Sequence, residues 1–414
     1  PLLGNDENVR AQVKIGVETY KKHFGRTPLG IWLPECAYRP RYVWKRPLGK
    51  GEEFERAGIE EILADYGLSY FMVDTHLLLG GEAVGVYAAR FPLLKEMWER
   101  FKQQYKPQPP PPNFERDPYV PYLVGTKEKN TAFFTRDEKT GLLVWSKDWG
   151  YPGDYNYREF HKRFENSGHR YWRITSTKLD LAYKEPYVPE WAQGRVREHA
   201  EHFANTVRGI LEDHWNAKHI PGIVVAAYDF ELIGGWFYEG PDWLKGVLKR
   251  VEDFEEIGTI TLGQYLSLHP PEVIISLPEG SWGQGGGHWV WLNEWTTWCW
   301  ERIYECEDIM KELAKYYETA DEDLKRILRQ MGRELLLLES SDWEFLITTW
   351  SARDYAENRV SQHYDWFKRL EKMARKKPSN EPLSPQDYAF LQYTEEVDRL
   401  FGDLDPRLFA GIAK

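Results

Sequence analysis

Cysteine is scarce in this chain, and its scarcity excludes two kinds of architecture. The 414 residues include only Cys36, Cys299 and Cys306, which are too few and too scattered for a disulfide framework or a zinc site. We expect them to be small apolar side chains in the core, the usual location of free cysteine. A reducing cytoplasm fits such a chain best, and no metal or other cofactor is expected.

Positive charge and long apolar runs are also lacking. The formal net charge is −11, and Lys and Arg are scattered without a basic stripe. Such a surface attracts neither nucleic acid nor an anionic membrane, so neither is expected as the main partner. No apolar run is long enough to span a bilayer, and no charged-then-apolar leader follows Pro1. The oligomeric state is not indicated by the sequence.

Aromatic side chains, by contrast, are abundant. The chain contains 19 Trp, 25 Tyr and 19 Phe. Tryptophan favours positions where one face is packed and the other meets a ligand. Sugar rings are such a ligand, because their C–H faces stack on indole while their hydroxyls need Asp, Glu and His. A large aromatic core explains the composition equally well, so both interpretations stay open at this point.

Helix and strand patterns alternate through the first two-thirds of the chain. The predicted helices cover residues 6–24, 52–66, 196–218 and 242–255, and the predicted strands cover residues 29–33, 70–73, 223–227 and 258–262. Helices that alternate with continuous apolar strands indicate a parallel sheet covered on both faces, or a barrel.

The strand patterns stop near residue 291. Helical periodicity with many charges then recurs over residues 294–317, 321–338, 351–376 and 385–401. We therefore predict an α/β domain over residues 1–277 and a linker with an all-helical domain over residues 278–414. Residues 90–127 fit neither pattern. They include five prolines within residues 106–113, which favour an extended segment outside the core, so this region is interpreted as an insertion or loop.

Two acidic residues lie just beyond the ends of predicted strands. Glu35 comes after residues 29–33 and Asp229 after residues 223–227. Retaining glycoside cleavage needs two carboxyls about 5–5.5 Å apart, and in parallel α/β barrels such groups lie at the carboxyl ends of strands. A single carboxylate at such a place is more often a helix cap or a surface group. Both residues, however, have aromatic and apolar neighbours, where an idle charge would be unfavourable.

Several segments, in order, resemble glycoside hydrolase family 57, and within it most closely the α-1,4-glucan branching enzymes. The segments are Gly30 to Pro40, Trp145-Ser146, Gly150 to Asp154, Tyr157 to Phe160, Asp229 to Gly240, Ser281 to Gly283, His288 to Asn293 and Ser340 to Trp343. They cover nearly the whole chain apart from residues 90–127. The resemblance implies an incomplete seven-stranded (β/α) barrel followed by an all-helical C-terminal domain.

The resemblance also implies roles for individual residues. Glu35 would be the nucleophile and Asp229 the general acid/base of a retaining reaction on α-1,4-glucan that forms α-1,6 branches. The implied substrate-binding residues are Trp145, Trp282, Trp291, Asp342 and, on a mobile loop, Tyr87.

Packing competes with sugar binding for several of these side chains. Trp291, Trp295 and Trp298 have helical spacing and could form a core stripe. We favour sugar contact for Trp291 and packing for the other two. A helix cap is the competing interpretation of Asp342.

The sequence departs from the family pattern at three places. The paired histidines of the family's opening strand are missing, so we expect the first barrel strands to be absent from this chain. Gly235 stands where the family usually has histidine, and residues 90–127 follow directly after the Tyr87 region. An α-amylase or a 4-α-glucanotransferase of the same family is the alternative enzyme, and a non-catalytic glucan-binding protein is the alternative of another class.

Overall fold

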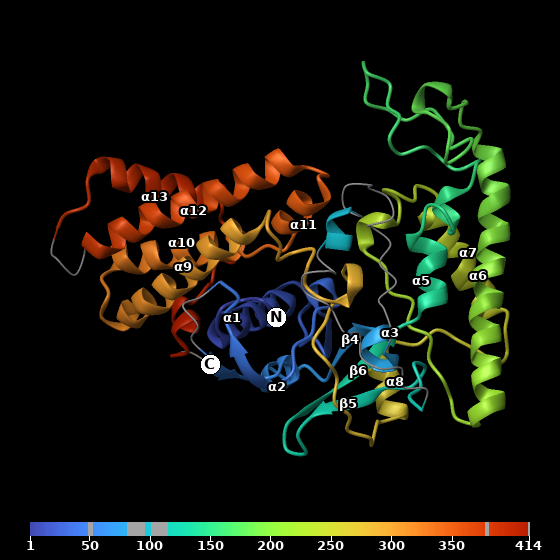
Figure 1. Cartoon of the computed structure of the whole chain (residues 1–414), viewed down its shortest axis with the longest axis horizontal. Coiled ribbons are helices and arrows are strands. Elements are labelled where there is room, and N and C mark those ends of the chain that lie inside the picture. Colours follow the sequence, from blue (N-terminus) through green and yellow to red (C-terminus); the bar gives the residue numbers. More distant parts are fainter. Residues whose placement is uncertain (49–52, 81–95, 101–114, 377–380, 413–414) are drawn as a thin grey trace.

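The computed structural model describes residues 1–48, 53–80, 96–100, 115–376 and 381–412 (Figure 1). A small sheet and helix α1 (Asp6–Phe24) occupy the middle of the molecule. One group of helices lies on the left in this view and another on the right (Figure 1).

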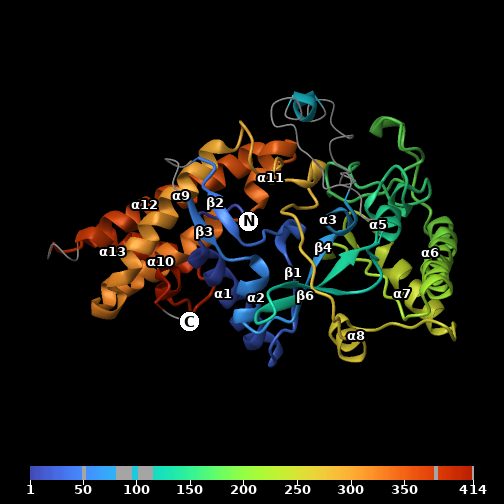
Figure 2. The same ribbon diagram turned by 60° about the horizontal axis from the view of Figure 1, so that its bottom comes forward.

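The central sheet explains how polar residues reach one edge. Its strands are β1 (Gly30–Trp32), β4 (Tyr70–Asp74), β6 (Asn130–Arg136) and β5 (Tyr122–Gly125), in that order. β1, β4 and β6 run parallel, while β5 pairs antiparallel with β6. The carboxyl ends of the three parallel strands therefore meet at the same edge. Figure 2 shows the sheet from another side, with the hairpin of β2 (Tyr42–Lys45) and β3 (Glu53–Arg56) beside it.

Alternating side chains of the sheet enter two different cores. Phe71, Val73 and Phe133 pack with residues of α1 and α2 (Ile59–Asp65), while Phe134 packs with Tyr265 of α8 (Leu262–Leu268). This alternation is the period of two that a strand imposes on its side chains. The sheet is thus covered on both faces, as predicted.

Two predicted strands are not strands in the structure. Residues 223–227 run beside β6 but share few backbone bonds with their surroundings: the amide of Ile223 donates to Tyr119 O at 2.9 Å, and the amide of Asp137 donates to Val225 O at 2.9 Å. In the other segment the Thr261 side chain caps α8 by accepting from the amide of Gln264. The predicted count of seven barrel strands is therefore not confirmed in the described residues.

Two further boundaries differ from the prediction. Residues 52–66 were expected to form one helix, but their first part forms β3, and α2 begins only at Ile59. The predicted insertion over residues 90–127 contains β5, because its Tyr122-Leu123-Val124 run pairs with β6.

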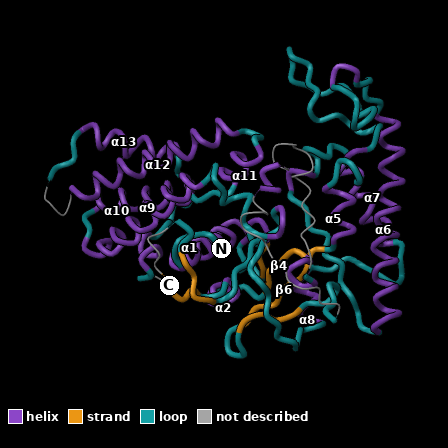
Figure 3. Tube along the Cα trace, viewed as in Figure 1, coloured by secondary structure: helices purple, strands orange, loops and turns teal. Residues whose placement is uncertain are grey.

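A second helical layer lies beyond the sheet. It consists of α5 (Glu138–Trp145), the long α6 (Pro189–Lys218) and α7 (Gly240–Glu252), which share a core around Trp243 and Phe237. These helices form the right side of the molecule in Figure 3.

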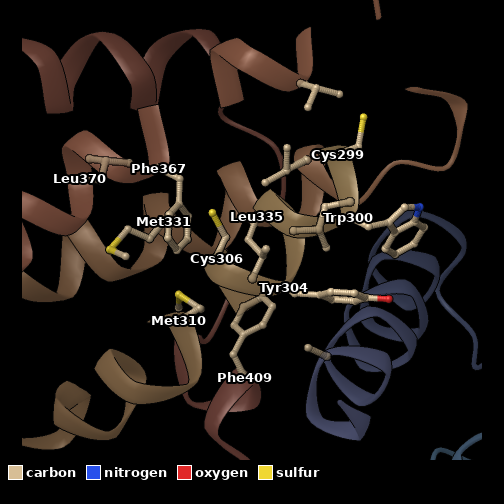
Figure 4. Close-up of a cluster of buried hydrophobic side chains, with 14 of the residues drawn as sticks. Cys299, Trp300, Tyr304, Cys306, Met310, Met331, Leu335, Phe367, Leu370 and Phe409 are labelled. Carbon is tan, nitrogen blue, oxygen red and sulfur yellow. The ribbon is translucent and has the colours of Figure 1, made fainter. Parts of the chain in front are cut away.

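The last quarter of the chain is helical, as predicted. Its helices are α9 (Thr297–Leu313), α10 (Glu322–Leu338), α11 (Asp342–Thr349), α12 (Arg353–Lys376) and α13 (Pro385–Val397). Their apolar faces meet in one core, part of which Figure 4 shows. Cys299 and Cys306 are buried in it and Cys36 is buried beside the sheet, so the expectation of free, buried cysteines is confirmed.

Helix α1 joins the sheet to this helical part. Val9 and Val17 pack into the core under the sheet, whereas Ala11 and Ile15 pack into the helical core. Asn8 and Gln12 each donate to the carboxylate of Glu339 at 2.7 Å. α1 therefore holds the sheet and the helical part in one arrangement. None of the described helices is long and apolar enough to cross a membrane.

Candidate active site

The backbone at Glu35 is strained where it leaves β1. Glu35 and Cys36 have φ angles of 59° and 47°, in the left-handed region that non-glycine residues rarely adopt. Such strain persists only where the surroundings hold it, and it clusters at functional sites. Three backbone bonds hold this turn: the amide of Cys36 donates to Leu33 O at 2.9 Å, that of Ala37 to Pro34 O at 3.0 Å, and that of Trp282 to Glu35 O at 3.1 Å.

The Glu35 carboxylate accepts one hydrogen bond on each oxygen. The indole N–H of Trp282 donates to Oε2 at 2.7 Å, and the hydroxyl of Ser341 donates to Oε1 at 3.1 Å. Burial raises the pKa of Glu35, while these two donors oppose the rise, and the charges of Asp342 and Asp229 add to it. The two donors hold the side chain in one orientation and favour its ionised form, which is the form that a nucleophile needs.

Asp229 has a different environment in the same cavity. It precedes the turn η4 (Phe230–Leu232), but its side chain makes no capping bond there, so the cap interpretation does not hold. Burial, together with the charge of Glu231, raises the pKa of Asp229 to about 6, although Arg136 opposes the rise. A carboxyl with such a pKa keeps a proton in weakly acidic solution, as a general acid must.

An ion pair that the sequence analysis missed lies at the ends of β4 and β6. Arg136 donates to Asp74 Oδ1 from Nη2 at 3.0 Å and from Nε at 3.2 Å. The Arg136 guanidinium also lies 5.0 Å from the centre of the Trp282 ring. Arg136 thus places a positive charge beside the carboxyls of the cavity. The available signal was that Asp74 follows a predicted strand, as Glu35 and Asp229 do.

The three tryptophans predicted to bind sugar all line the cavity. Trp282 lies edge-to-face with Trp32 and with Trp145, at centroid distances of 5.4 and 5.7 Å. Trp145 donates its indole N–H to Ala227 O at 3.2 Å. Two of the tryptophans that the resemblance implied, Trp145 and Trp282, therefore lie in one connected aromatic group beside Glu35.

Trp291 differs from Trp282 because it is only 5% exposed and belongs to the helical core. Trp295 and Trp298 are partly buried and pack against the same core, which confirms the packing predicted for them. Among the described residues, the indole nitrogen of Trp291 has no hydrogen-bond partner. Trp291 thus combines a packing role with a place on the cavity wall.

The remaining predicted residues are placed as follows. Asp342 lines the cavity and is the first residue of α11, whose cap position is taken by Ser341. Burial raises the pKa of Asp342. Tyr87 lies outside the described residues. At Gly235 a Cβ would lie 2.2 Å from Glu231 O, so this backbone has no room for the histidine of the family pattern.

The cavity that these groups share has a volume of about 1230 Å³. Typical sites for single small ligands measure roughly 300–1,000 Å³, so this one has room for a longer ligand. Its wall combines aromatic faces with the carboxyls of Glu35, Asp229 and Asp342. Such a wall suits a neutral, hydroxyl-rich molecule with apolar ring faces.

Within the described residues, one group has the spacing of metal ligands. Glu334, His363 and Asp398 are buried together in the helical part. None of them is among the residues that line the cavity.

The family is decided by comparison with known proteins. Residues 1–278 match glycosyl hydrolase family 57, and residues 302–409 match the C-terminal region of 1,4-alpha-glucan branching enzymes. The chain belongs to glycosyl hydrolase family 57. A 1,4-alpha-glucan branching enzyme of Thermococcus kodakarensis is 42% identical over 97% of this chain and 56% of its own length.

Solved structures of the family have the same fold. The GH57 branching enzyme of the same archaeon, in complex with glucose and additives, matches with a TM-score of 0.87 at 41% identity, over 99% of this chain and 70% of that one. An α-amylase from Thermotoga maritima matches with a TM-score of 0.74 at 28% identity, over 98% and 69% of the two chains. The fold is therefore that of GH57 branching enzymes, with a helical C-terminal part. The chain spans about half the length of the curated relatives it matches.

The position of Trp291 leads to a prediction about stability. Trp291→Ala should lower the free energy of unfolding by about 3–5 kcal/mol, as other large-to-small core replacements do. Trp295→Ala is the matched control and should lower it by less, because Trp295 is only partly buried. Denaturant unfolding of both variants measures the difference. A Trp291→Ala variant as stable as the wild type, with weaker glucan binding, would show that the indole contributes to ligand binding alone.

Proposed function

We propose that this protein forms α-1,6 branches in α-1,4-glucan by a retaining double displacement. Glu35 attacks the anomeric carbon, the bond from that carbon to the leaving oxygen breaks, and Asp229 gives its proton to that oxygen. Asp229 then takes the proton of the 6-hydroxyl of an acceptor chain. The acceptor oxygen attacks the same carbon and releases the Glu35 carboxylate.

One observation carries this proposal: two carboxyls line one cavity, and their contacts suit two different tasks. Glu35 receives a hydrogen bond on each oxygen, which favours its charged form. The pKa of Asp229 is raised to about 6, which favours its protonated form. Burial raises the pKa of both groups, but at Glu35 the two hydrogen-bond donors oppose the rise. Such differences of environment between two carboxyls are typical of a nucleophile and an acid.

The aromatic group beside Glu35 supports α-glucan as the substrate. We assign to Trp145, Trp282, Trp291 and Asp342 the binding of glucose units around the cleaved bond, and Tyr87 stays a proposed member of this set. Residues 278–414 act in this proposal as a second domain that completes the site, since Trp282 and Ser341 both contact Glu35.

Hydrolysis is the second candidate, because a relative of 28% identity is named an α-amylase. The two reactions share the glycosyl-enzyme and differ only in whether water or a sugar hydroxyl attacks it. A glucan-binding protein without turnover is less consistent with the two carboxyls, which binding alone does not require.

The products formed from amylose by the full-length protein distinguish these candidates. Branching should produce new α-1,6 linkages, detected through their anomeric protons by NMR, with little increase in reducing ends. Short linear sugars with many new reducing ends would indicate hydrolysis. Linear chains of redistributed length would indicate 4-α-glucanotransfer, and unchanged amylose would contradict an enzymatic role.

A further inference from the structure

A short loop after Asp229 presents a tryptophan that the sequence analysis did not single out. The amide of Gly234 donates to Phe237 O at 2.8 Å, and the amide of Phe237 donates to Leu232 O at 2.9 Å, so the loop closes on itself. Gly234 has a φ of 95°, which favours glycine. This closed loop places Trp236 on the wall of the cavity.

Trp236 is supported from behind by a second ring. It stacks on Phe160 with a centroid distance of 4.3 Å and an interplanar angle of 18°. The guanidinium of Arg170 lies 4.4 Å from the centre of the Phe160 ring, and its Nε donates to Phe160 O at 2.6 Å. His161 meets Trp236 edge-on at 6.0 Å. The indole is therefore held in one orientation by neighbours that are themselves fixed.

The other side of Trp236 remains open. The residue is 50% exposed although Phe160 covers one face. A flat indole that is rigidly supported behind and open in front has the form of a stacking platform. Glu231, which also lines the cavity and is exposed, offers a carboxylate for the hydroxyls of a ring placed there.

We propose that Trp236, supported by Phe160, is a binding platform for a glucose ring of the α-glucan chain away from the cleaved bond. This inference rests on the proposed function, because a transfer reaction must hold a donor and an acceptor chain in one site. Glu35 contacts a different aromatic group through Trp282, whose ring in turn meets those of Trp32 and Trp145. The Trp236 platform extends the glucan-binding surface along another part of the same wall.

Binding without turnover tests the platform. In full-length protein carrying Glu35→Gln, the affinity for maltoheptaose is measured by isothermal titration calorimetry, with and without Trp236→Ala. Loss of the stacking face should weaken binding by roughly five- to tenfold. Trp236→Phe should retain most of the affinity, and Phe160→Leu should weaken it by less than Trp236→Ala, because it removes only the support.

Trp215→Ala is the matched control. Trp215 is 51% exposed, lies on α6 and is not among the residues that line the cavity, so its loss should leave binding unchanged. If Trp236→Ala bound maltoheptaose as tightly as its parent, the platform would be overturned and the proposed function would remain intact. The same would hold if Trp215→Ala weakened binding as much as Trp236→Ala. A parent protein that binds no maltoheptaose would instead contradict the proposed function itself. Thermal melts of each variant confirm that it is folded.

Discussion

Replacing Glu35 with glutamine should reduce turnover of amylose by a factor on the order of 10⁴ or more, as losses of catalytic nucleophiles do. The amide keeps the shape of the side chain and can still meet Trp282 and Ser341, but it cannot form the glycosyl-enzyme. Because the carboxylate acts mainly in the transition state, glucan affinity should remain close to that of the wild type. Initial rates and equilibrium binding, measured on the same preparations, separate the two effects.

Glu231→Gln is the control for this replacement. Glu231 lies in the same cavity and carries the same charge, but it has no role in covalent chemistry in our proposal. It should therefore retain a large part of wild-type turnover. If Glu35→Gln retained as much turnover as Glu231→Gln, the nucleophile would have to be a different carboxylate.

Asp229→Asn should also remove nearly all turnover of amylose, because the leaving oxygen of the cleaved glycosidic bond needs a proton. A substrate such as α-maltosyl fluoride needs no such proton, so it should still form the glycosyl-enzyme, which then persists for lack of a base. Azide attacks without general-base assistance and should restore its release as the α-maltosyl azide. Absence of azide rescue, or a β-configured azide product, would contradict the acid/base assignment.

The pH profile of the wild type provides an independent check on Asp229. The free enzyme needs Asp229 protonated, so kcat/KM should fall as the pH rises through about 6, the pKa to which burial raises this carboxyl. The Glu231 charge contributes to that rise, and Glu231→Gln should therefore move this limb to lower pH. A limb that does not move would indicate that another group controls it.

The placement of Glu35 and Asp229 in one cavity could be predicted from the sequence, because each residue follows a short apolar segment. The Ile223-Val224-Val225 run also shows the limit of such patterns. β-branched residues fit a half-buried extended backbone whether or not it is hydrogen-bonded to a neighbouring strand. A run of such residues therefore does not show that a strand pair forms. This run is not a strand, and it still brings Asp229 to the cavity. Strand β5, by contrast, was present but not predicted, because the prolines before it indicated a loop.

Contacts between distant parts of the chain account for what the sequence could not show. Ser341 follows Glu35 by 306 residues, and its hydrogen bond depends on how the turn after β1 meets the start of α11. The pairing of Arg136 with Asp74 depends on the adjacency of β4 and β6, and β6 itself was not predicted. Periodicity reports which side chains share a face of one element, but it does not report which elements become neighbours.

The identity of the residue that becomes glycosylated tests the central claim most directly. The full-length Asp229→Asn protein is mixed with α-maltosyl fluoride, denatured in acid, digested and analysed by tandem mass spectrometry. We predict that one maltosyl unit is attached to the peptide containing Glu35, on the carboxylate of that residue. Attachment to Glu231, Asp342 or any other side chain would contradict the mechanism, as would turnover of the fluoride with no covalent adduct at Glu35.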